Sequence, residues 1–199
     1  IGGKTNVYVN IIGEPVSGSI QNDNTINLGT PVPLSFLLQI GQDIYGENAQ
    51  DRSGNSVSIS DDGNIVAIGA FLNGDGGSAA GQVRVYENVN DIWVQIGQDI
   101  DGDVSQDLSG WSVSLNSTGN IVAIGAAAAG LVRIYQLTTN IWTKIGADIV
   151  DPDQTTVGGN SFGFSVGLNS NGTIVVIGAP ATGAGTVNHG RVVVYKNVS

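Results

Sequence analysis

The stretch Asn120-Ile121-Val122-Ala123-Ile124-Gly125-Ala126 decides the fold, because the chain repeats its pattern twice more. The two counterparts are Asn64-Ile65-Val66-Ala67-Ile68-Gly69-Ala70 and Thr173-Ile174-Val175-Val176-Ile177-Gly178-Ala179. A short continuous apolar run between turn residues is typical of a strand that neighbouring sheets cover on both faces. We therefore expect three buried strands, one in each copy of a longer repeat.

Other segments recur in register around these strands. Upstream, Trp93-Val94-Gln95-Ile96-Gly97 matches Trp142-Thr143-Lys144-Ile145-Gly146 and, less closely, Leu37-Leu38-Gln39-Ile40-Gly41. A segment that alternates serine with apolar residues, such as Ser112-Val113-Ser114-Leu115, precedes each buried strand. A closing Gly-x-Val-x-Val/Ile-Tyr strand follows it at residues 81–86, 130–135 and 190–195. Four strands in a unit of about fifty residues predict the blade of a β-propeller.

Compact turns join the second and third predicted strands of each unit. They are residues 60–64, 116–120 and 169–173, and each contains a glycine next to Asn, Asp, Ser or Thr. Glycine supplies the positive φ of a tight hairpin, and the short polar side chains bond to nearby backbone groups. The loops between the third and fourth strands differ in length, which is where repeat proteins usually place binding specificity.

The repeats divide the chain into four parts. Residues 1–36 are expected to hold the closing strand of a preceding blade, at residues 3–8, and an irregular insertion rich in Pro, Gly and Asn; a separate small β element is the alternative. Residues 37–90, 91–140 and 141–199 are expected to be blades. The predicted fold class is all-β, a β-propeller-like array of three four-stranded antiparallel blades. Since propellers have four to eight blades, the array is expected to belong to a larger or oligomer-completed ring.

Composition limits the partners. The 199 residues include 17 acidic and seven basic side chains, for a net charge of -10, so nucleic acid and anionic membranes would be repelled. No apolar window reaches the length of a membrane-spanning helix. The chain has no Cys and no Met, which excludes disulfides and suggests an excerpt of a longer polypeptide. This composition suits an exposed β-protein in an extracellular setting or on a particle surface.

A family resemblance rests on two motifs of the third copy. Phe162-Gly163 followed by Gly178-Ala179-Pro180 is similar to the signature of FG-GAP repeats, and the other copies carry Ser-Gly with Gly-Ala. The chain resembles FG-GAP β-propellers, such as the head of integrin α-subunits, over residues 37–199. The resemblance implies a binding platform. Calcium binding at the family's loop position is not expected in this chain, because residues 166–174 contain Asn, Ser and Thr where calcium needs several carboxylates.

The densest acidic segment is Asp99-Ile100-Asp101-Gly102-Asp103 with Asp107, and the next copy carries Asp148, Asp151 and Asp153. Such carboxylates could surround a calcium ion. Solvated turn residues are the favoured interpretation, because Asp is common in turns. A glycosidase pair is disfavoured, since nothing sets two acids on opposite sides of a sugar. We therefore predict no catalytic residue, no metal site and no cofactor.

The remaining candidate residues are aromatic, imidazole or amide side chains. His189 has no second His or Cys to form a metal set, so an exposed loop position is expected. Trp93 and Trp142 share one repeat position and are expected to pack between blades, which leaves Trp111 as the tryptophan expected to be most exposed. Asn116, Asn171 and Asn197 each begin an Asn-x-Ser/Thr sequence, the acceptor for glycosylation in a eukaryotic secretory route.

The sequence therefore predicts a non-enzymatic structural or adhesive module on the exterior surface of a cell, extracellular filament or virus particle. Its partners would be proteins, including copies of itself, because an array of three blades leaves an apolar face uncovered at each end. Two alternatives stay open. One is a carbohydrate-binding propeller with glycan partners, and the other is a non-catalytic part of a larger secreted enzyme.

Overall fold

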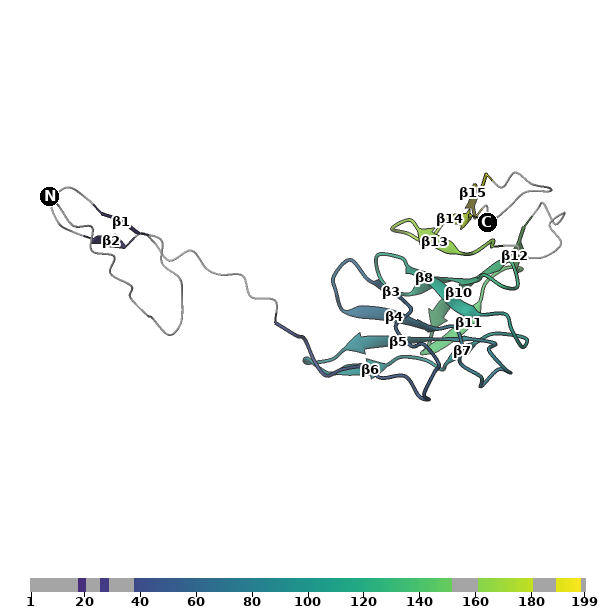
Figure 1. Cartoon of the computed structure of the whole chain (residues 1–199), viewed down its shortest axis with the longest axis horizontal. Coiled ribbons are helices and arrows are strands. Elements are labelled where there is room, and N and C mark those ends of the chain that lie inside the picture. Colours follow the sequence, from purple (N-terminus) through teal and green to yellow (C-terminus); the bar gives the residue numbers. More distant parts are fainter. Residues whose placement is uncertain (1–17, 21–25, 29–37, 152–160, 181–188, 198–199) are drawn as a thin grey trace, which may run out of the picture. The chain divides into compact units, whose positions relative to one another are not determined.

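The computed structural model describes residues 18–20, 26–28, 38–151, 161–180 and 189–197 (Figure 1). The chain forms two compact units, Ile1–Gln39 and Ile40–Ser199. In the first unit, β1 (Gly18–Ile20) pairs with β2 (Ile26–Leu28) as an antiparallel hairpin. The closing strand expected at residues 3–8 lies outside the described residues. No helix in the described part of the chain is long and apolar enough to cross a membrane.

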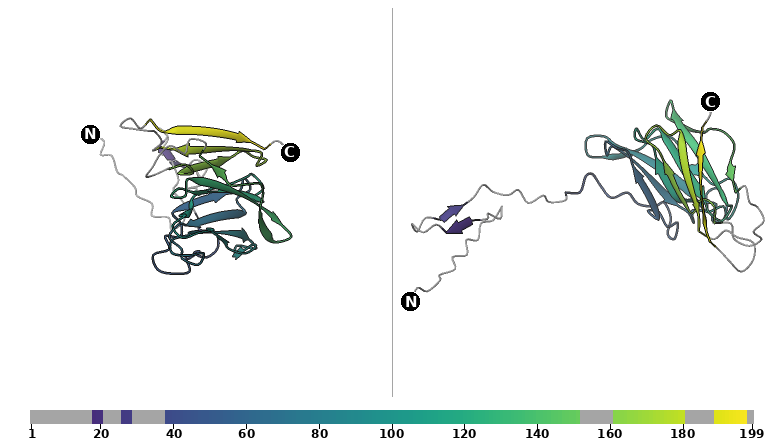
Figure 2. Two further views of the ribbon diagram at one scale, coloured as in Figure 1. Left: turned by 90° about the vertical axis from the view of Figure 1, so that its right-hand side faces the viewer. Right: turned by 90° about the horizontal axis from the view of Figure 1, so that it is seen from above.

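The second unit contains three antiparallel sheets (Figure 2). In the first sheet, β3 (Ser56–Ile59), β4 (Ile65–Ala70), β5 (Gln82–Asn88) and β6 (Trp93–Gln95) follow one another, and β7 (Ile100–Asp101) also pairs with β5. The second sheet repeats this order with β8 (Ser109–Leu115), β9 (Ile121–Ala126), β10 (Leu131–Thr138), β11 (Ile141–Lys144) and β12 (Ile149–Val150). The third sheet consists of β13 (Ser165–Leu168), β14 (Ile174–Ala179) and β15 (Arg191–Lys196).

The predicted hairpins join the first two strands of each sheet. Gly63, Gly119 and Gly172 have φ of 75°, 69° and 71°, the left-handed conformation that glycine adopts without strain. A side-chain oxygen at the start of each turn accepts a hydrogen bond from the backbone N–H at the start of the next strand. Asn116 Oδ1, for example, lies 2.9 Å from the nitrogen of Ile121. The turn therefore fixes the register of the hairpin.

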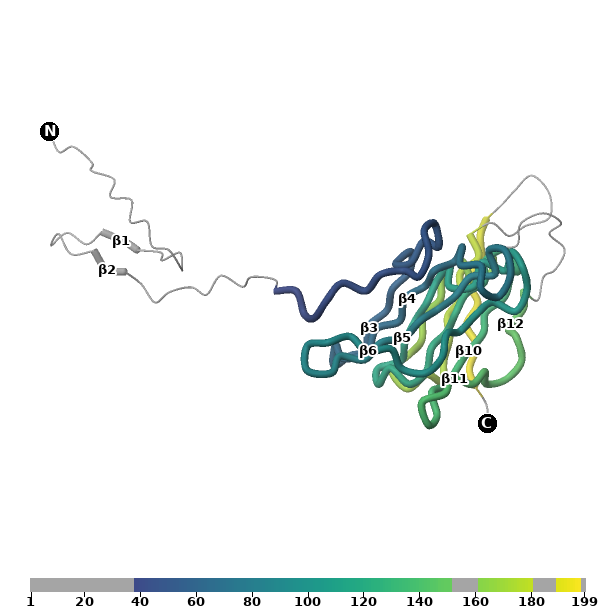
Figure 3. The backbone as a smooth tube through the Cα atoms, turned by 90° about the horizontal axis from the view of Figure 1, so that it is seen from below, coloured from purple at the N-terminus to yellow at the C-terminus, as the bar shows by residue number. Residues whose placement is uncertain are grey.

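The three sheets lie in sequence order, as the path of the backbone in Figure 3 shows. Strand β8 of the middle sheet contacts β3 and β4 on one side and β13 on the other. On β9, Val122 belongs to the apolar cluster facing the first sheet, whereas Ala123 belongs to the cluster facing the third. Both residues are completely buried. The prediction of a strand covered on both faces is confirmed for the middle sheet.

The sheets are offset by one strand from the sequence repeats. Trp93–Gln95, which opens the predicted blade at residues 91–140, pairs with β5 and completes the preceding sheet. Ile141–Lys144, which opens the predicted blade at residues 141–199, likewise pairs with β10. As a result, the third sheet has three strands among the described residues, where four were predicted. The outermost strand of each complete sheet is therefore supplied by the repeat that follows.

The first and last sheets each expose one apolar face. Val57 and Ile59 of β3 are 66% and 59% exposed, and Val192 and Val194 of β15 are 68% and 62% exposed. Val132 occupies the position of Val192 in the middle sheet, where the third sheet buries it completely. The exposure thus follows from position in the array, because residue type is the same in both places.

Candidate functional site

The residues that carry the family resemblance join neighbouring sheets. Ser112 Oγ donates a hydrogen bond to the carbonyl oxygen of Gly163 (2.7 Å), and Ser56 Oγ does the same to Gly110 (2.7 Å). A Cβ atom at Gly125 would overlap the carbonyl oxygen of Gly163. Phe162, the residue before Gly163, is completely buried in the cluster between the second and third sheets. In this chain these motif residues have a packing role.

Arg133 is the centre of the main charged cluster. Its guanidinium group lies 3.0 Å from a carboxylate oxygen of Asp103, 3.1 Å from Asp107 and 3.2 Å from Asp148. Burial alone would lower the pKa of Arg133, but the three carboxylates outweigh it and raise that pKa. Burial likewise opposes ionisation of Asp148, yet hydrogen bonds from Lys144 and Arg133 lower its pKa. Arg133 and Lys144 thus offset part of the negative charge of the three carboxylates, and these contacts join β10 to the loop between β7 and β8 and to the loop between β11 and β12.

The structure divides the acidic segment that the sequence singled out. Asp103 and Asp107 bind Arg133, whereas Asp99 accepts a hydrogen bond from Gln95 (2.6 Å) and Asp101 accepts one from Gln82 (3.2 Å). The described residues contain no group of three His, Cys, Asp or Glu side chains placed to hold a metal ion. The interpretation of these acids as solvated turn residues is wrong for Asp107, which is 3% exposed, because the Arg133 ion pair draws it inward.

The first and third sheets carry polar clusters of their own at the matching end. In the first, buried Gln82 donates hydrogen bonds to Glu47 and Asp101, each 3.2 Å away. Burial raises the pKa of Asp101, and the Gln82 hydrogen bond only partly offsets that effect. In the third, Arg191 pairs with buried Asp151; the neighbouring candidate Asp153 lies outside the described residues. The carboxylates of the three clusters therefore contact different residues, namely Gln82, Arg133 and Arg191.

The two tryptophans at the shared repeat position pack as expected. The indole Nε1 of Trp142 donates to the carbonyl oxygen of Ile96 (3.0 Å), and that of Trp93 donates to Ile40 (2.9 Å). Trp142 is almost fully buried, and Trp93 is half-buried. Trp142 thus links the second sheet to the segment that follows β6 of the first sheet, and Trp93 links the first sheet to the segment that precedes it.

Trp111 is half-buried in a cluster of three aromatic rings, edge-to-face with Phe71 and tilted against Phe164. Its ring centroid lies 4.8 Å from that of Phe71 and 5.5 Å from that of Phe164. Trp111 is more exposed than Trp142 and, like Trp93, is half-buried. The sequence could not predict this aromatic cluster, because Phe71 comes from a loop that differs between repeats.

The remaining candidates lie at the surface, with one exception. His189 is exposed and lines a shallow hollow with Phe164 and Arg191. Asn171 and Asn197 are also exposed. Asn116 is 5% exposed, and its amide nitrogen donates to Asn120 (2.9 Å). Attachment of a glycan at Asn116 would therefore require the turn to open.

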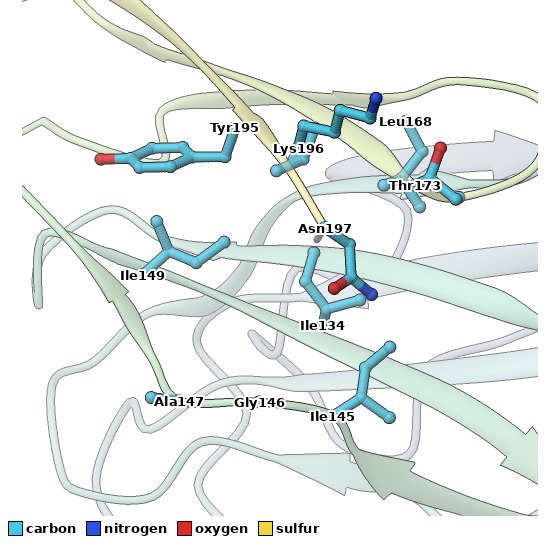
Figure 4. A pocket seen from close by; sticks show the side chains of 12 residues that line it. Ile134, Ile145, Gly146, Ala147, Ile149, Leu168, Thr173, Tyr195, Lys196 and Asn197 are labelled. Atoms are coloured by element: carbon cyan, nitrogen blue, oxygen red, sulfur yellow. The ribbon is translucent and has the colours of Figure 1, made fainter. Parts of the chain in front are cut away.

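An apolar groove of about 290 Å³, which we call the terminal groove, lies between the second and third sheets (Figure 4). Ile134, Ile145 and Ile149 line it from the second sheet. Leu168, Val175 and Tyr195 line it from the third sheet, together with Lys196 and the adjacent Asn197. No acidic residue contributes to the lining. The groove is suited to an apolar side chain.

Comparisons with known proteins give low similarity. No family model and no curated protein matches the chain. Two putative 6-phosphogluconolactonases are similar in structure: that of Bacteroides uniformis has a TM-score of 0.49 at 14% identity over 90% of this chain, and that of Bacteroides fragilis 0.48 at 12% over 91%. The periplasmic gluconolactonase of Pseudomonas aeruginosa gives 0.46 at 11% over 81%. The alignments cover 46%, 47% and 42% of those proteins, so this chain spans less than half their length. Similarity of this size assigns no activity to the chain.

Proposed function

We propose that this chain is a non-enzymatic structural or adhesive module that assembles with other proteins on an exterior surface. The observation that carries the proposal is the apolar outer face of the third sheet, formed by Val176, Val192 and Val194. All three side chains are exposed, and Val176 pairs directly with Val194 across the sheet. Their counterparts in the middle sheet, Ala123, Val132 and Ile134, pack in the core cluster beneath the third sheet.

Burial of this apolar face would favour association. Full burial of a valine side chain contributes about 1.5 to 3 kcal/mol relative to exposure. A contiguous apolar patch of several such residues on a protein surface usually marks an interface. The opposite end of the array adds a second patch with Val57 and Ile59 of the first sheet. We propose that the three sheets are propeller blades of the FG-GAP type within a larger or oligomer-completed ring, and that these faces meet further blades.

Sedimentation velocity of residues 1–199 tests the proposal. We expect the wild-type chain to self-associate and the double variant Val192→Lys, Val194→Lys to associate at least tenfold more weakly, because two lysine side chains within the patch oppose its burial. Val104→Lys is the matched control, because Val104 is 58% exposed in a loop away from the terminal faces. A wild-type chain that stays monomeric at high concentration would contradict assembly through this face.

Carbohydrate binding is the second candidate, and one observation favours it. Phe164 is 45% exposed beside half-buried Trp111, and exposed aromatic rings can stack on sugars. The two rings are tilted by 51° to each other and contact one another, which favours the packing role. The test is electrophoresis of the chain in gels that contain polysaccharides. If the polysaccharide retarded the wild-type chain and did not retard Trp111→Ala, carbohydrate binding would be favoured over assembly.

A further inference from the structure

We propose that the terminal groove is the acceptor site for a fourth β-strand of the Trp-x-x-Ile-Gly type, supplied by a partner polypeptide, with the tryptophan as its anchor. This inference rests on the proposed function, because it names the kind of partner that a protein-assembly module would bind. It concerns the inner face of the third sheet and the edge formed by β15, which pairs with β14 alone among the described residues, whereas the valine patch lies on the outer face.

Two filled sites in the same chain show the chemistry of the occupant. Gly41 and Gly97 have φ of 72° and 71°, and each faces an indole ring. A Cβ atom on Gly97 would lie 2.5 Å from Cδ1 of Trp142, and one on Gly41 would lie 2.9 Å from Cδ1 of Trp93. In both cases the residue before the glycine is an isoleucine whose carbonyl oxygen accepts the indole N–H. The repeated element is thus a seat made of Ile-Gly for a tryptophan on the next sheet.

The third seat, Ile145-Gly146, has the same backbone conformation as the other two but no indole ring beside it among the described residues. Gly146 follows Ile145, and its φ is 75°. A Cβ atom on Gly146 would meet no heavy atom of the described residues within 4 Å beyond its chain neighbours. Ile145 and Gly146 instead line the terminal groove (Figure 4). The groove therefore occupies the place that an indole ring fills at the two other seats.

The edge of β15 offers the matching backbone. Strand β6 pairs with β5 through Tyr86↔Gln95, Glu87↔Val94 and Asn88↔Trp93, and β11 pairs with β10 in the same register. Among the described residues, β15 pairs with β14 alone. The register of the two complete sheets, transferred to β15, places the new tryptophan opposite Asn197. The indole ring then lies above Gly146, as it lies above Gly41 and Gly97.

One difference between the seats sets the strength of binding. Gln98 accepts the backbone N–H of Trp142 (3.0 Å) and donates to its carbonyl oxygen (2.7 Å), and Gln42 holds Trp93 in the same way. The corresponding residue after Gly146 is Ala147, which can make neither bond. An incoming strand therefore binds through the indole ring and the strand edge, without the two additional hydrogen bonds.

The test is a titration of the full chain with a fluorescein-labelled peptide of residues 90–97, Asn-Asp-Ile-Trp-Val-Gln-Ile-Gly, followed by fluorescence anisotropy. We expect saturable binding that falls at least tenfold when the peptide tryptophan is replaced by alanine. Ala147→Gln should tighten binding by about tenfold, because it restores both hydrogen bonds. Gly146→Ala should weaken it at least tenfold, because the added methyl group occupies the place of the indole ring.

Gly63→Ala is the matched control for Gly146→Ala. Gly63 has the same φ of 75°, lies in the turn between β3 and β4, and a Cβ atom there would meet only Ile59 Cδ1, at 4.0 Å. Both variants carry the same backbone strain, so equal melting temperatures with unequal peptide affinities would support the groove as the binding site. Equal affinities in the two variants, or binding that ignores the peptide tryptophan, would overturn the proposal.

A second copy of the chain is the competing occupant, through its segment Leu37-Leu38-Gln39-Ile40-Gly41. Leu38 is 86% exposed. If Gly146→Ala and Leu38→Lys each abolished self-association, a second copy would be the occupant and the tryptophan-bearing partner would be refuted. If the peptide failed to bind while Val192→Lys, Val194→Lys still reduced association, this inference would fall and the proposed assembly function would stand.

Discussion

Arg133 and Asp107 form an ion pair inside the protein. Both terminal guanidinium nitrogens lie 3.1 Å from Asp107 Oδ2, and the two side chains are 5% and 4% exposed. The pair joins β10 to the loop between β7 and β8, which packs beside it. Buried charges of this kind are costly unless they are fully paired, so removal of one partner costs more than the pair itself contributes.

We expect Asp107→Ala to lower the free energy of unfolding by about 3 kcal/mol, because it leaves Arg133 buried with only two carboxylates. Asp103→Ala removes a carboxylate that is 53% exposed, and its cost should be below about 1 kcal/mol. Urea unfolding followed by circular dichroism measures both. Equal losses in the two variants would show that burial does not set the strength of these pairs.

Asp148 and Asp101, whose pKa values are displaced in opposite directions, predict opposite pH effects. The pKa of Asp148 is lower in the folded protein, so its stabilising effect is present above the unfolded pKa of about 3.9 and is lost as pH falls through the folded pKa. The pKa of Asp101 is raised, so its ionisation above pH 4 destabilises the folded state. At pH 7, Asp148→Asn should therefore lower the melting temperature and Asp101→Asn should leave it unchanged or raise it. Thermal melts between pH 3 and 7 would contradict this assignment if the two variants changed in the same direction.

The sequence predicts most of the local structure, because the same residue types recur at equivalent positions in two or three copies of the repeat. The hairpin glycines, the buried strand that contains Val122, and the packing of Trp142 all follow from such recurrence. The offset between sheets and repeats could not be predicted, since strand spacing is the same whichever sheet the Trp93 segment joins. The Arg133 cluster could not be predicted from the sequence either, because its residues come from three separate segments that meet only in the folded protein.

Chelation separates the ion-pair interpretation of the acidic segment from a calcium site. Asp101 already accepts a hydrogen bond from Gln82, and Asp103 and Asp107 face the positive charge of Arg133, which would repel a cation. We therefore expect EDTA to leave the melting temperature unchanged, because a ligand bound only by the folded state would stabilise it measurably. A melting temperature that falls with EDTA and returns with calcium, and not with magnesium, would contradict this interpretation.

The position of a residue in the array should decide the effect of a buried charge. Val122 and Val66 occupy the same place in β9 and β4, but Val122 is completely buried and Val66 is half-buried because no described sheet covers its face. Val122→Asp places an unpaired carboxylate between two sheets and should cost about 4 kcal/mol or more, enough to prevent stable folding. Val66→Asp should cost clearly less, since water reaches that face, and Val94→Asp on β6, where the valine is 47% exposed, should cost least. Melting temperatures of the three variants give the order, and a cost at Val66 equal to that at Val122 would mean that another part of the assembly covers the first sheet in solution.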